Sequence, residues 1–234
     1  MRLRVASYNI HKAVGLDGRR DPERILTVLK EIDADVIALQ EADRRFGRRE
    51  TCLPLDMIDD HGLYRAVQLD TRPDSIGWHG NALLVRKGVE VVDASVVPLP
   101  VIEPRGAVCA DVMVHGVRLR VVGMHLDISG IRRRGQVRAV IGHVAQCGPP
   151  CATVLMGDLN QWSVARGAMR EFGHAWQLLS PGRSFPSRRP VAGLDRIIIC
   201  DRLRAADTGV HHSALATRAS DHLPVWADLV AATA

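Results

Sequence analysis

Residues 153–160 read TVLMGDLN, an apolar run that stops at a glycine and then presents a carboxylate and a carboxamide. The apolar residues 153–156 predict a strand buried on both faces, and Gly157 permits a turn or a close backbone contact. Asp158 and Asn160 then follow the carboxyl end of the strand, where ligands bind in layered α/β proteins, and their spacing predicts that both point to the same side. On this stretch alone, an Asx-rich turn is an equally good interpretation.

Length and composition favour one domain covering residues 1–234. Hydrophobic residues make up 47% of the chain and charged residues 24%, as in ordinary globular proteins, and no apolar run has the length that a membrane span needs. The N-terminal sequence MRLRV leads directly into strand-like sequence, without the apolar core of a signal peptide. We therefore expect a cytoplasmic monomer with no transmembrane segment.

The charge balance favours polyanionic partners. A net charge of +5 and a pI of about 9.3 suit nucleic acid, an anionic lipid surface or a phosphorylated small molecule. An aromatic content of 4% weakens the case for base stacking. The five cysteines show no zinc-site spacing, so we expect free thiols at Cys52, Cys109, Cys147, Cys151 and Cys200.

The hydrophobic pattern predicts two sheets packed together and flanked by helices, in an α/β fold. Asp21 and Pro22 start a helix whose apolar residues recur at helical spacing; a second helix is expected over 129–146 and a short one over 164–172. Residues 42–79 are expected to form loops with short irregular elements. The expected strands are 4–10, 36–40, 81–86, 89–97, 107–114, 117–125, 153–156, 196–200, 208–212 and 224–229.

Polar side chains recur where these predicted strands end. Because strand ends gather at one rim of a layered sheet protein, such residues are expected to converge on one cleft. Oxygen-rich ligands with few cysteines favour a hard cation such as Mg²⁺ or Mn²⁺ over zinc. The residues are Asn9, His11, Glu41, His125, Asp158, Asn160, Asp195, Asp221 and His222.

Five short motifs at these strand ends carry a resemblance to a known family. They read SYNI (7–10), LQE (39–41), GDLN (157–160), LDRI (194–197) and SDHLP (220–224). In their order the chain resembles the endonuclease/exonuclease/phosphatase superfamily, whose fold is DNase I-like. The resemblance implies a four-layer α/β sandwich, in which two mixed sheets pack face to face between helices, and a divalent metal, usually Mg²⁺.

The resemblance also implies roles for the polar residues. Glu41 matches the main metal ligand, with Asn9 and Asp221 close to the metal or its waters. In the repair enzymes of the superfamily, a carboxylate usually stands where this chain has His11, so the chain departs from that subtype at this position.

A second set of matches concerns the reacting groups. Asp158 would orient or deprotonate the attacking water, and Asn160 would hold that water or a phosphate oxygen. His222, oriented by Asp195, would contact the phosphate and take up developing charge, since a carboxylate fixes the tautomer of an imidazole and raises its basicity. His125 matches a histidine near the scissile phosphate.

Three further residues are candidates for binding substrate phosphate: Arg105, His11 and Asn81. Arg105 precedes a predicted strand and suits bidentate contact with a phosphate, although a surface residue is its competing interpretation. The sequence His79-Gly80-Asn81 is a turn signal first, and a place for Asn81 in the lining of the cleft is the alternative. The arginine run 132–134 is by default a solvated helix face, with contact to phosphate backbone or lipid headgroups as the alternative.

The leading functional hypothesis is a Mg²⁺-dependent phosphodiesterase, a nuclease that uses direct water attack without a covalent intermediate. The short chain leaves little room for long loops that grip a duplex. A phosphatase or phosphodiesterase acting on phospholipid headgroups or small phosphorylated molecules is the enzyme alternative. A non-catalytic polyanion-binding module is the third hypothesis, and the complete set of hydrolytic residues argues against it.

Overall fold

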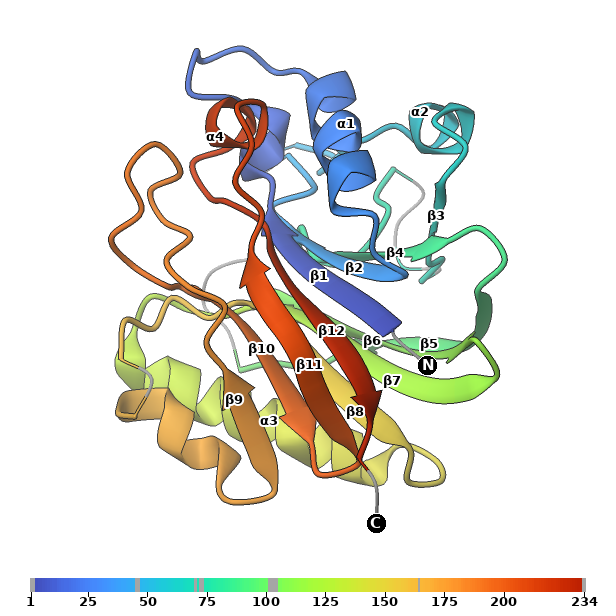
Figure 1. The fold of residues 1–234 in the computed structure, drawn as a ribbon, viewed down its shortest axis with the longest axis vertical. Coiled ribbons are helices and arrows are strands. Elements are labelled where there is room, and N and C mark those ends of the chain that lie inside the picture. The colour runs from blue at the N-terminus through green and yellow to red at the C-terminus, as the bar shows by residue number, and fades with distance from the viewer. Residues whose placement is uncertain are drawn as a thin grey trace.

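Two six-stranded sheets pack face to face in the computed structural model, which describes residues 3–44, 47–69, 71, 74–100, 105–163 and 165–232 (Figure 1). The first sheet has the order β11 (Leu203–Val210), β12 (Val225–Ala231), β1 (Leu3–Asn9), β2 (Val36–Gln40), β4 (Ala82–Arg86) and β3 (Tyr64–Ala66). The second has the order β5 (Glu90–Val97), β6 (Gly106–Val114), β7 (Val117–His125), β8 (Ala152–Asp158), β10 (Asp195–Cys200) and β9 (Trp176–Leu179).

Helices cover the outer face of each sheet, so the molecule has four layers. The first sheet carries α1 (Pro22–Ile32), α2 (Leu55–Asp60) and α4 (Ala216–Ala219), and the second carries α3 (Gly130–Gln146) and the 3-10 helix η2 (Gly167–Phe172). The Asp21 carboxylate caps α1, as its position before Pro22 predicts. The four-layer α/β sandwich expected from the sequence is confirmed.

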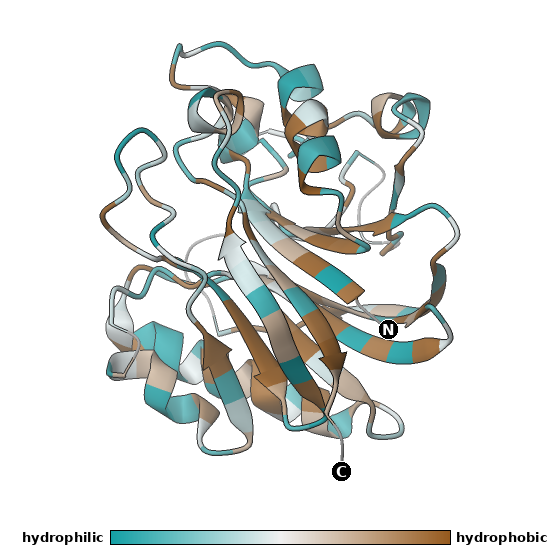
Figure 2. Cartoon of the chain, viewed as in Figure 1, coloured by the Kyte–Doolittle hydropathy of each residue, from teal (hydrophilic) through white to brown (hydrophobic). Residues whose placement is uncertain are grey.

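Alternation along the buried strands divides the core into three clusters. In β1, Val5 faces the opposite sheet while Ala6 and Tyr8 face α1. Figure 2 shows that many strand residues are hydrophobic, whereas the loops around them are mostly hydrophilic. Along the described ranges, no helix combines the length and the apolar character that crossing a membrane requires.

Parallel pairing brings the candidate residues to one end of the sheets. Strands β1 and β2 run parallel with Asn9 beside Gln40, and β7 and β8 run parallel with His125 beside Asp158. Strand β10 runs antiparallel to β8 and begins with Asp195 beside Asp158. These ends lie at the upper left of the two sheets in Figure 1.

Several predicted boundaries were wrong. The strand predicted over 153–156 continues through Gly157 and ends at Asp158. Of the strand predicted over 208–212, only residues 208–210 lie in a strand, where they end β11. The earlier part of β11 was missed because an irregularity between Ala205 and Asp207 and exposed polar residues obscure the period-two pattern.

Short elements were not individually predicted, since packing rather than local pattern defines them. The region 42–79 contains α2 and β3, while β9 and α4 lie in segments for which no element was predicted. The short helix predicted over 164–172 is a 3-10 helix, and its predicted first residue, Val164, lies outside the described part of the chain.

Candidate active site

Strand β8 delivers Asp158 to the site, and Gly157 makes that possible. A Cβ atom at Gly157 would lie 1.8 Å from the carbonyl oxygen of Met124 on the neighbouring strand β7, so no larger residue fits without backbone movement. The glycine therefore serves close strand approach rather than the turn. Asp158 follows as the last residue of the strand, with 2% of its surface exposed.

The carboxylate of Asp158 is the centre of the polar network. Its Oδ2 atom accepts a hydrogen bond from Asn9 Nδ2 at 3.1 Å and lies 3.3 Å from His125 Nε2 and 3.8 Å from His222 Nε2. Burial raises the pKa of this carboxyl, but the hydrogen bond and charge of His125 and the charge of His222 outweigh burial and hold the pKa well below its usual range. Asp158 is therefore an anion at neutral pH.

His222 is held by a second buried carboxylate. Its Nδ1 atom lies 2.9 Å from Asp195 Oδ2, which also accepts a hydrogen bond from the Ser184 hydroxyl. The ring of Phe185 packs against the imidazole with centroids 4.8 Å apart. Burial disfavours the imidazolium, yet the Asp195 and Asp158 carboxylates outweigh burial and raise the pKa of His222 to about 10. The ring is thus oriented, and it is cationic at neutral pH.

Asn160 joins the network through a turn. It adopts φ 50°, and its backbone N–H donates to Asp158 Oδ1 at 2.9 Å, so the Asx-turn interpretation is confirmed. The extended conformation assumed for this spacing does not reach Asn160, because the backbone turns there. The Asn160 carboxamide donates to the carbonyl of Leu126 at 3.0 Å and ties the β8 loop to the loop after His125.

Asn9 is fixed on three sides. Its Nδ2 donates to Asp158, its Oδ1 accepts from the His11 backbone N–H at 3.1 Å, and its carbonyl accepts from the Ser220 hydroxyl at 2.7 Å. The same Ser220 oxygen accepts the backbone N–H of His222 at 3.2 Å. One serine therefore links β1 to the loop that carries His222.

Glu41 lies just beyond β2 and forms an ion pair with Lys12, whose backbone N–H also donates to the Glu41 carbonyl at 3.0 Å. Burial raises the pKa of the Glu41 carboxyl, but the charges of His125, Lys12 and His11 together lower it below its ordinary value. Glu41 therefore carries a negative charge and already attracts a cation.

The donors near Glu41 fit a hard divalent cation. Glu41, Asn9 and Asp221 offer oxygen atoms, which Mg²⁺ prefers, and the side chain of Asp221 is 34% exposed with Oδ1 3.9 Å from His11 Nδ1. A second possible group consists of Asp158, Asp195 and His222, whose ligand atoms lie within 4.8 Å of one another. Asp195 and His222 already satisfy each other by a hydrogen bond, so we favour the first group.

The three candidates for phosphate binding differ in placement. The guanidinium of Arg105 lies against the His125 ring, with Nη1 2.9 Å from Nδ1, and so reaches the site. His11 Nδ1 lies 3.0 Å from the Val14 carbonyl and faces Asp221. Asn81 is fully buried; its Nδ2 donates within its own turn, and its Oδ1 has no hydrogen-bond partner among the described residues.

Left-handed backbone conformations gather around the site. Non-glycine residues with positive φ cost about 1–2 kcal/mol each and persist where the surrounding structure holds them. Such residues occur in the loop after β1, directly after β2 and directly after β8: His11, Lys12, Ala13, Glu41 and Asn160. Strain stored at three converging loops is typical of a functional site.

Comparison with known proteins identifies the family. A model described as the Endonuclease/Exonuclease/phosphatase family matches residues 6–222. The chain belongs to this family. It is a hydrolase of phosphoester bonds, a phosphoesterase, as the family's members are. The motifs at the ends of β1, β2, β8 and β10 and before β12 thus fall on a fold that this family shares.

Three similar proteins illustrate the family's range. The uncharacterized protein YbhP of Escherichia coli K12 is 26% identical over 253 residues, covering 97% of this chain and 96% of YbhP. An endonuclease/exonuclease/phosphatase from Bacteroides vulgatus has a TM-score of 0.78 at 17% identity, covering 99% of this chain and 100% of that one. A mannosyl-6-phosphatase from Bacteroides thetaiotaomicron has a TM-score of 0.73 at 18% identity, covering 97% and 99%.

The site of this family member includes residues that sequence reasoning missed. Ser184 and Ser220 support Asp195 and Asn9, and Lys12 pairs with Glu41. Ser220 stands inside the SDHLP motif, which was the one available signal for it. Nothing in the sequence indicated Ser184 or Lys12, because both contacts join distant segments.

The arginine run after β7 is not uniformly solvated. Arg133 is 8% exposed and donates to the carbonyls of Asp127 and Ile128 and to Gln161 Oε1. The prediction of a solvated face was therefore wrong for Arg133, since its guanidinium bridges the loops that follow β7 and β8. Two exposed apolar side chains stand on these bridged loops, Ile128 at 67% and Trp162 at 68% exposure.

Proposed function

We propose that this protein is a Mg²⁺-dependent phosphodiesterase that cleaves nucleic acid by direct attack of water on phosphorus. The observation that carries the proposal is the environment of Asp158 Oδ2, where an Asn9 amide and the His125 and His222 imidazoles meet one buried anion. A carboxylate that stays ionised beside two imidazoles suits the handling of a water nucleophile and a phosphate at the same place.

Glu41, Asn9 and Asp221 would hold the Mg²⁺ ion. When bound, the metal would polarise a phosphoryl oxygen and offset the charge that builds up on it. The ammonium of Lys12 pairs with Glu41 and would have to move aside or share that carboxylate. Its presence indicates that the carboxylate accepts a cation.

Asp158 would orient the attacking water by accepting a hydrogen bond from it. Asn9 holds the carboxylate from one side, and Asn160 secures it from the other through its backbone N–H, so the acceptor lone pair is fixed before substrate arrives. No side chain needs to bond covalently to phosphorus in this scheme.

His222 and His125 would stabilise the charge that develops on the phosphoryl oxygens. His222 is a cation at neutral pH because Asp195 holds it, and it can donate from Nε2 toward the phosphate. His125 lies between Asp158 and Arg105, so the guanidinium adds a positive charge on the same side. These side chains are already in place, so they would stabilise a dianionic transition state without reorganising.

Surface chemistry beside the site supports nucleic acid as the substrate class. The net charge of +5 attracts polyanions, and the exposed indole of Trp162 follows Asn160 by two residues. An indole face stacks on an unpaired base for about 1–3 kcal/mol. Single-stranded nucleic acid would use both features at once.

A phospholipid headgroup is the second candidate substrate. Ile131 is 86% exposed at the start of α3, and Ile128 lies three residues before it. Apolar side chains beside arginines also suit insertion into an anionic membrane surface. The two candidate substrates would depend on different residues of this surface: nucleic acid on Trp162, and an anionic membrane on Ile128 and Ile131.

The first test compares hydrolysis of bis-p-nitrophenyl phosphate and p-nitrophenyl phosphate by the wild type with Mg²⁺, Mn²⁺ or EDTA. We expect turnover of the diester that EDTA abolishes. Preference for the monoester would contradict the phosphodiesterase assignment and favour a phosphatase. A folded protein that hydrolyses neither substrate but binds DNA would favour the binding-module hypothesis.

The second test uses the surface residues. We expect Trp162→Ala to weaken cleavage of a single-stranded oligonucleotide more than Ile131→Ala does, since the indole stacks and the isoleucine does not. If Ile131→Ala instead lowers hydrolysis of anionic phospholipid vesicles, and neither change affects the oligonucleotide, the lipid candidate is favoured and nucleic acid is rejected.

A further inference from the structure

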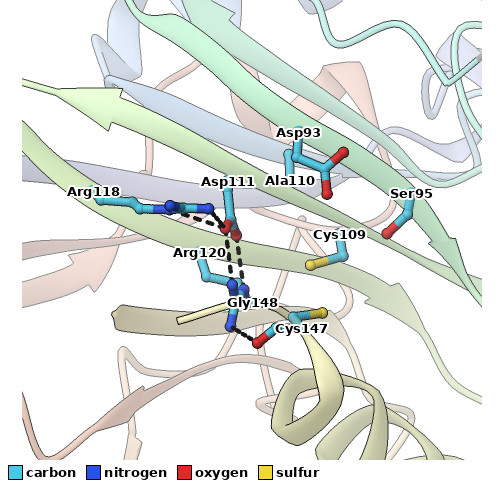
Figure 3. Close-up of a pocket in the computed structure, with 9 residues that line it drawn as sticks. All are labelled: Asp93, Ser95, Cys109, Ala110, Asp111, Arg118, Arg120, Cys147 and Gly148. Atoms are coloured by element: carbon cyan, nitrogen blue, oxygen red, sulfur yellow. Dashed lines mark hydrogen bonds and ion pairs between the residues drawn. The ribbon is translucent and has the colours of Figure 1, made fainter. Parts of the chain in front are cut away.

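A cavity of about 100 Å³ lies between the second sheet and the end of α3, away from the active site (Figure 3). Its walls come from β5, β6, β7 and the residues that follow α3. Cys109 packs in the cluster on the α3 side of the sheet, together with Met124, whereas the next residue, His125, alternates to the opposite face. The cavity and the catalytic network are thus on opposite faces of the same strands.

Three ligand atoms of soft or borderline character meet at this cavity. Atoms of Cys109, His143 and Cys147 all lie within 4.8 Å of one another. His143 and Cys147 are four residues apart at the C-terminal end of α3, so they share one face of the helix. Cys109 comes from β6 and completes the group.

A buried ion pair fixes the geometry of this group. Arg120 on β7 pairs with Asp111 through two hydrogen bonds of 2.7 and 2.8 Å, and its Nη1 donates to the Cys147 carbonyl at 3.3 Å. Figure 3 shows Arg120 between the strand that carries Cys109 and the helix end that carries Cys147. The helix end therefore has a defined position against the sheet, and the two sulfur atoms face a preformed space.

We propose that Cys109, His143 and Cys147 form a second metal site, which binds Zn²⁺ or another thiophilic cation and locks the end of α3 to β6. Two thiolates and one imidazole form a ligand set for zinc. The Ser95 hydroxyl lines the cavity and lies 3.5 Å from His143 Nε2. This site differs in ligand chemistry from the oxygen-rich group around Glu41.

Cobalt titration of the reduced full-length protein tests the proposal, because thiolate-bound Co²⁺ gives an intense charge-transfer absorption that oxygen-bound Co²⁺ at the active site lacks. We expect the wild type to develop this band to saturation at one equivalent and to release the cobalt to added Zn²⁺. Cys147→Ser abolishes the band. The control Cys200→Ser retains it, because Cys200 on β10 is a free cysteine outside the group.

Thermal unfolding supplies the second measurement. Zn²⁺ is expected to raise the melting temperature of the wild type and of Cys200→Ser, but not that of Cys147→Ser or His143→Gln. A wild type with no charge-transfer band, or a band unchanged in Cys147→Ser, would overturn the proposal. A Cys109–Cys147 disulfide found by peptide mapping of the metal-free protein purified under reducing conditions would also overturn it and identify a redox pair instead.

Discussion

The side chains that surround the Asp158 carboxylate come from several segments of the chain. Its carboxylate is an anion because an imidazole from β7 and another from the loop before β12 face it, while Asn9 from the other sheet binds the same oxygen. Each partner comes from a different segment of the chain.

We expect Asp195→Asn to lower kcat roughly 10²–10⁴-fold with little change in KM, because His222 loses the carboxylate that orients its ring and keeps it charged. The pH–rate profile should shift as well, since the pKa of His222 is raised mainly by Asp195. Steady-state kinetics with a melting curve measure both effects. The exposed Asp207→Asn serves as control, and a loss of activity explained entirely by unfolding would contradict a positioning role.

Glu41→Gln is expected to raise the Mg²⁺ concentration for half-maximal activity by roughly tenfold or more, since ligand charge sets affinity for hard cations. Titration calorimetry with Mg²⁺ checks the same point without turnover. Asp195→Asn should leave the Mg²⁺ affinity unchanged. The reverse pattern would assign the metal to the group of Asp158, Asp195 and His222.

The candidate residues themselves could be predicted from the sequence, but their supporting contacts could not. Asn9, Asp158 and His222 stand in motifs at predicted strand ends, and the structure brings them together. Lys12 reaches Glu41 only because three successive residues adopt left-handed conformations, which local propensity disfavours. Sequence patterns do not reveal such strained loops.

Among the elements, β7 and β8 approach each other closely next to the site. Their parallel pairing places His125 beside Asp158, and Gly157 allows the strands to approach at Met124. The sequence predicted both strands from their apolar runs. It did not distinguish a glycine that ends a strand from one inside it, because that depends on the neighbouring backbone.

Gly157→Ala is expected to destabilise the protein by about 1–3 kcal/mol and to displace Asp158, because the new methyl group overlaps the Met124 carbonyl. Gly142→Ala on α3, where nothing lies within 4 Å of a new Cβ, should stabilise it by about 0.5–1 kcal/mol. Urea denaturation measures both changes. Equal effects of the two substitutions would contradict the close strand approach.

A contact between α1 and the loop after β11 should make stability depend on pH. Glu31 Oε2 accepts from the Ser213 hydroxyl at 2.6 Å and lies 2.8 Å from His211 Nε2. Burial raises the pKa of Glu31, but these two partners outweigh it and lower the pKa below the ordinary value of 4.5. The stabilisation is therefore full above pH 4.5 and is lost as the pH falls through the lower, folded-state value.

Glu31→Gln should accordingly lower the melting temperature at pH 6, and the difference should shrink as the pH falls below 4.5, because the wild type then loses the same contribution. The gap at pH 6 corresponds to about 0.2–1 kcal/mol, since the pair is partly exposed. Melting curves across this range check the trend, with the exposed Glu90→Gln as control. A gap that grows toward pH 3 would contradict the assignment.

Across the whole molecule, the candidate site forms because the two packed sheets place the strand ends that carry its polar residues at the same rim. Asn9 and Glu41 come from the first sheet, and His125, Asp158 and Asp195 come from the second. The order of the strand-end motifs predicted this convergence. The group of Cys109, His143 and Cys147 escaped prediction because Cys109 on β6 is far in sequence from the two residues at the end of α3.

Hydrolysis by Asp158→Asn under saturating Mg²⁺ tests the proposed mechanism most directly, measured on bis-p-nitrophenyl phosphate and on a single-stranded oligonucleotide. We predict a loss of about 10³-fold or more on both substrates with an unchanged fold, because the variant lacks the anion that handles the water. The exposed Asp201→Asn should keep full activity. Turnover by Asp158→Asn within a few-fold of the wild type would contradict the proposal.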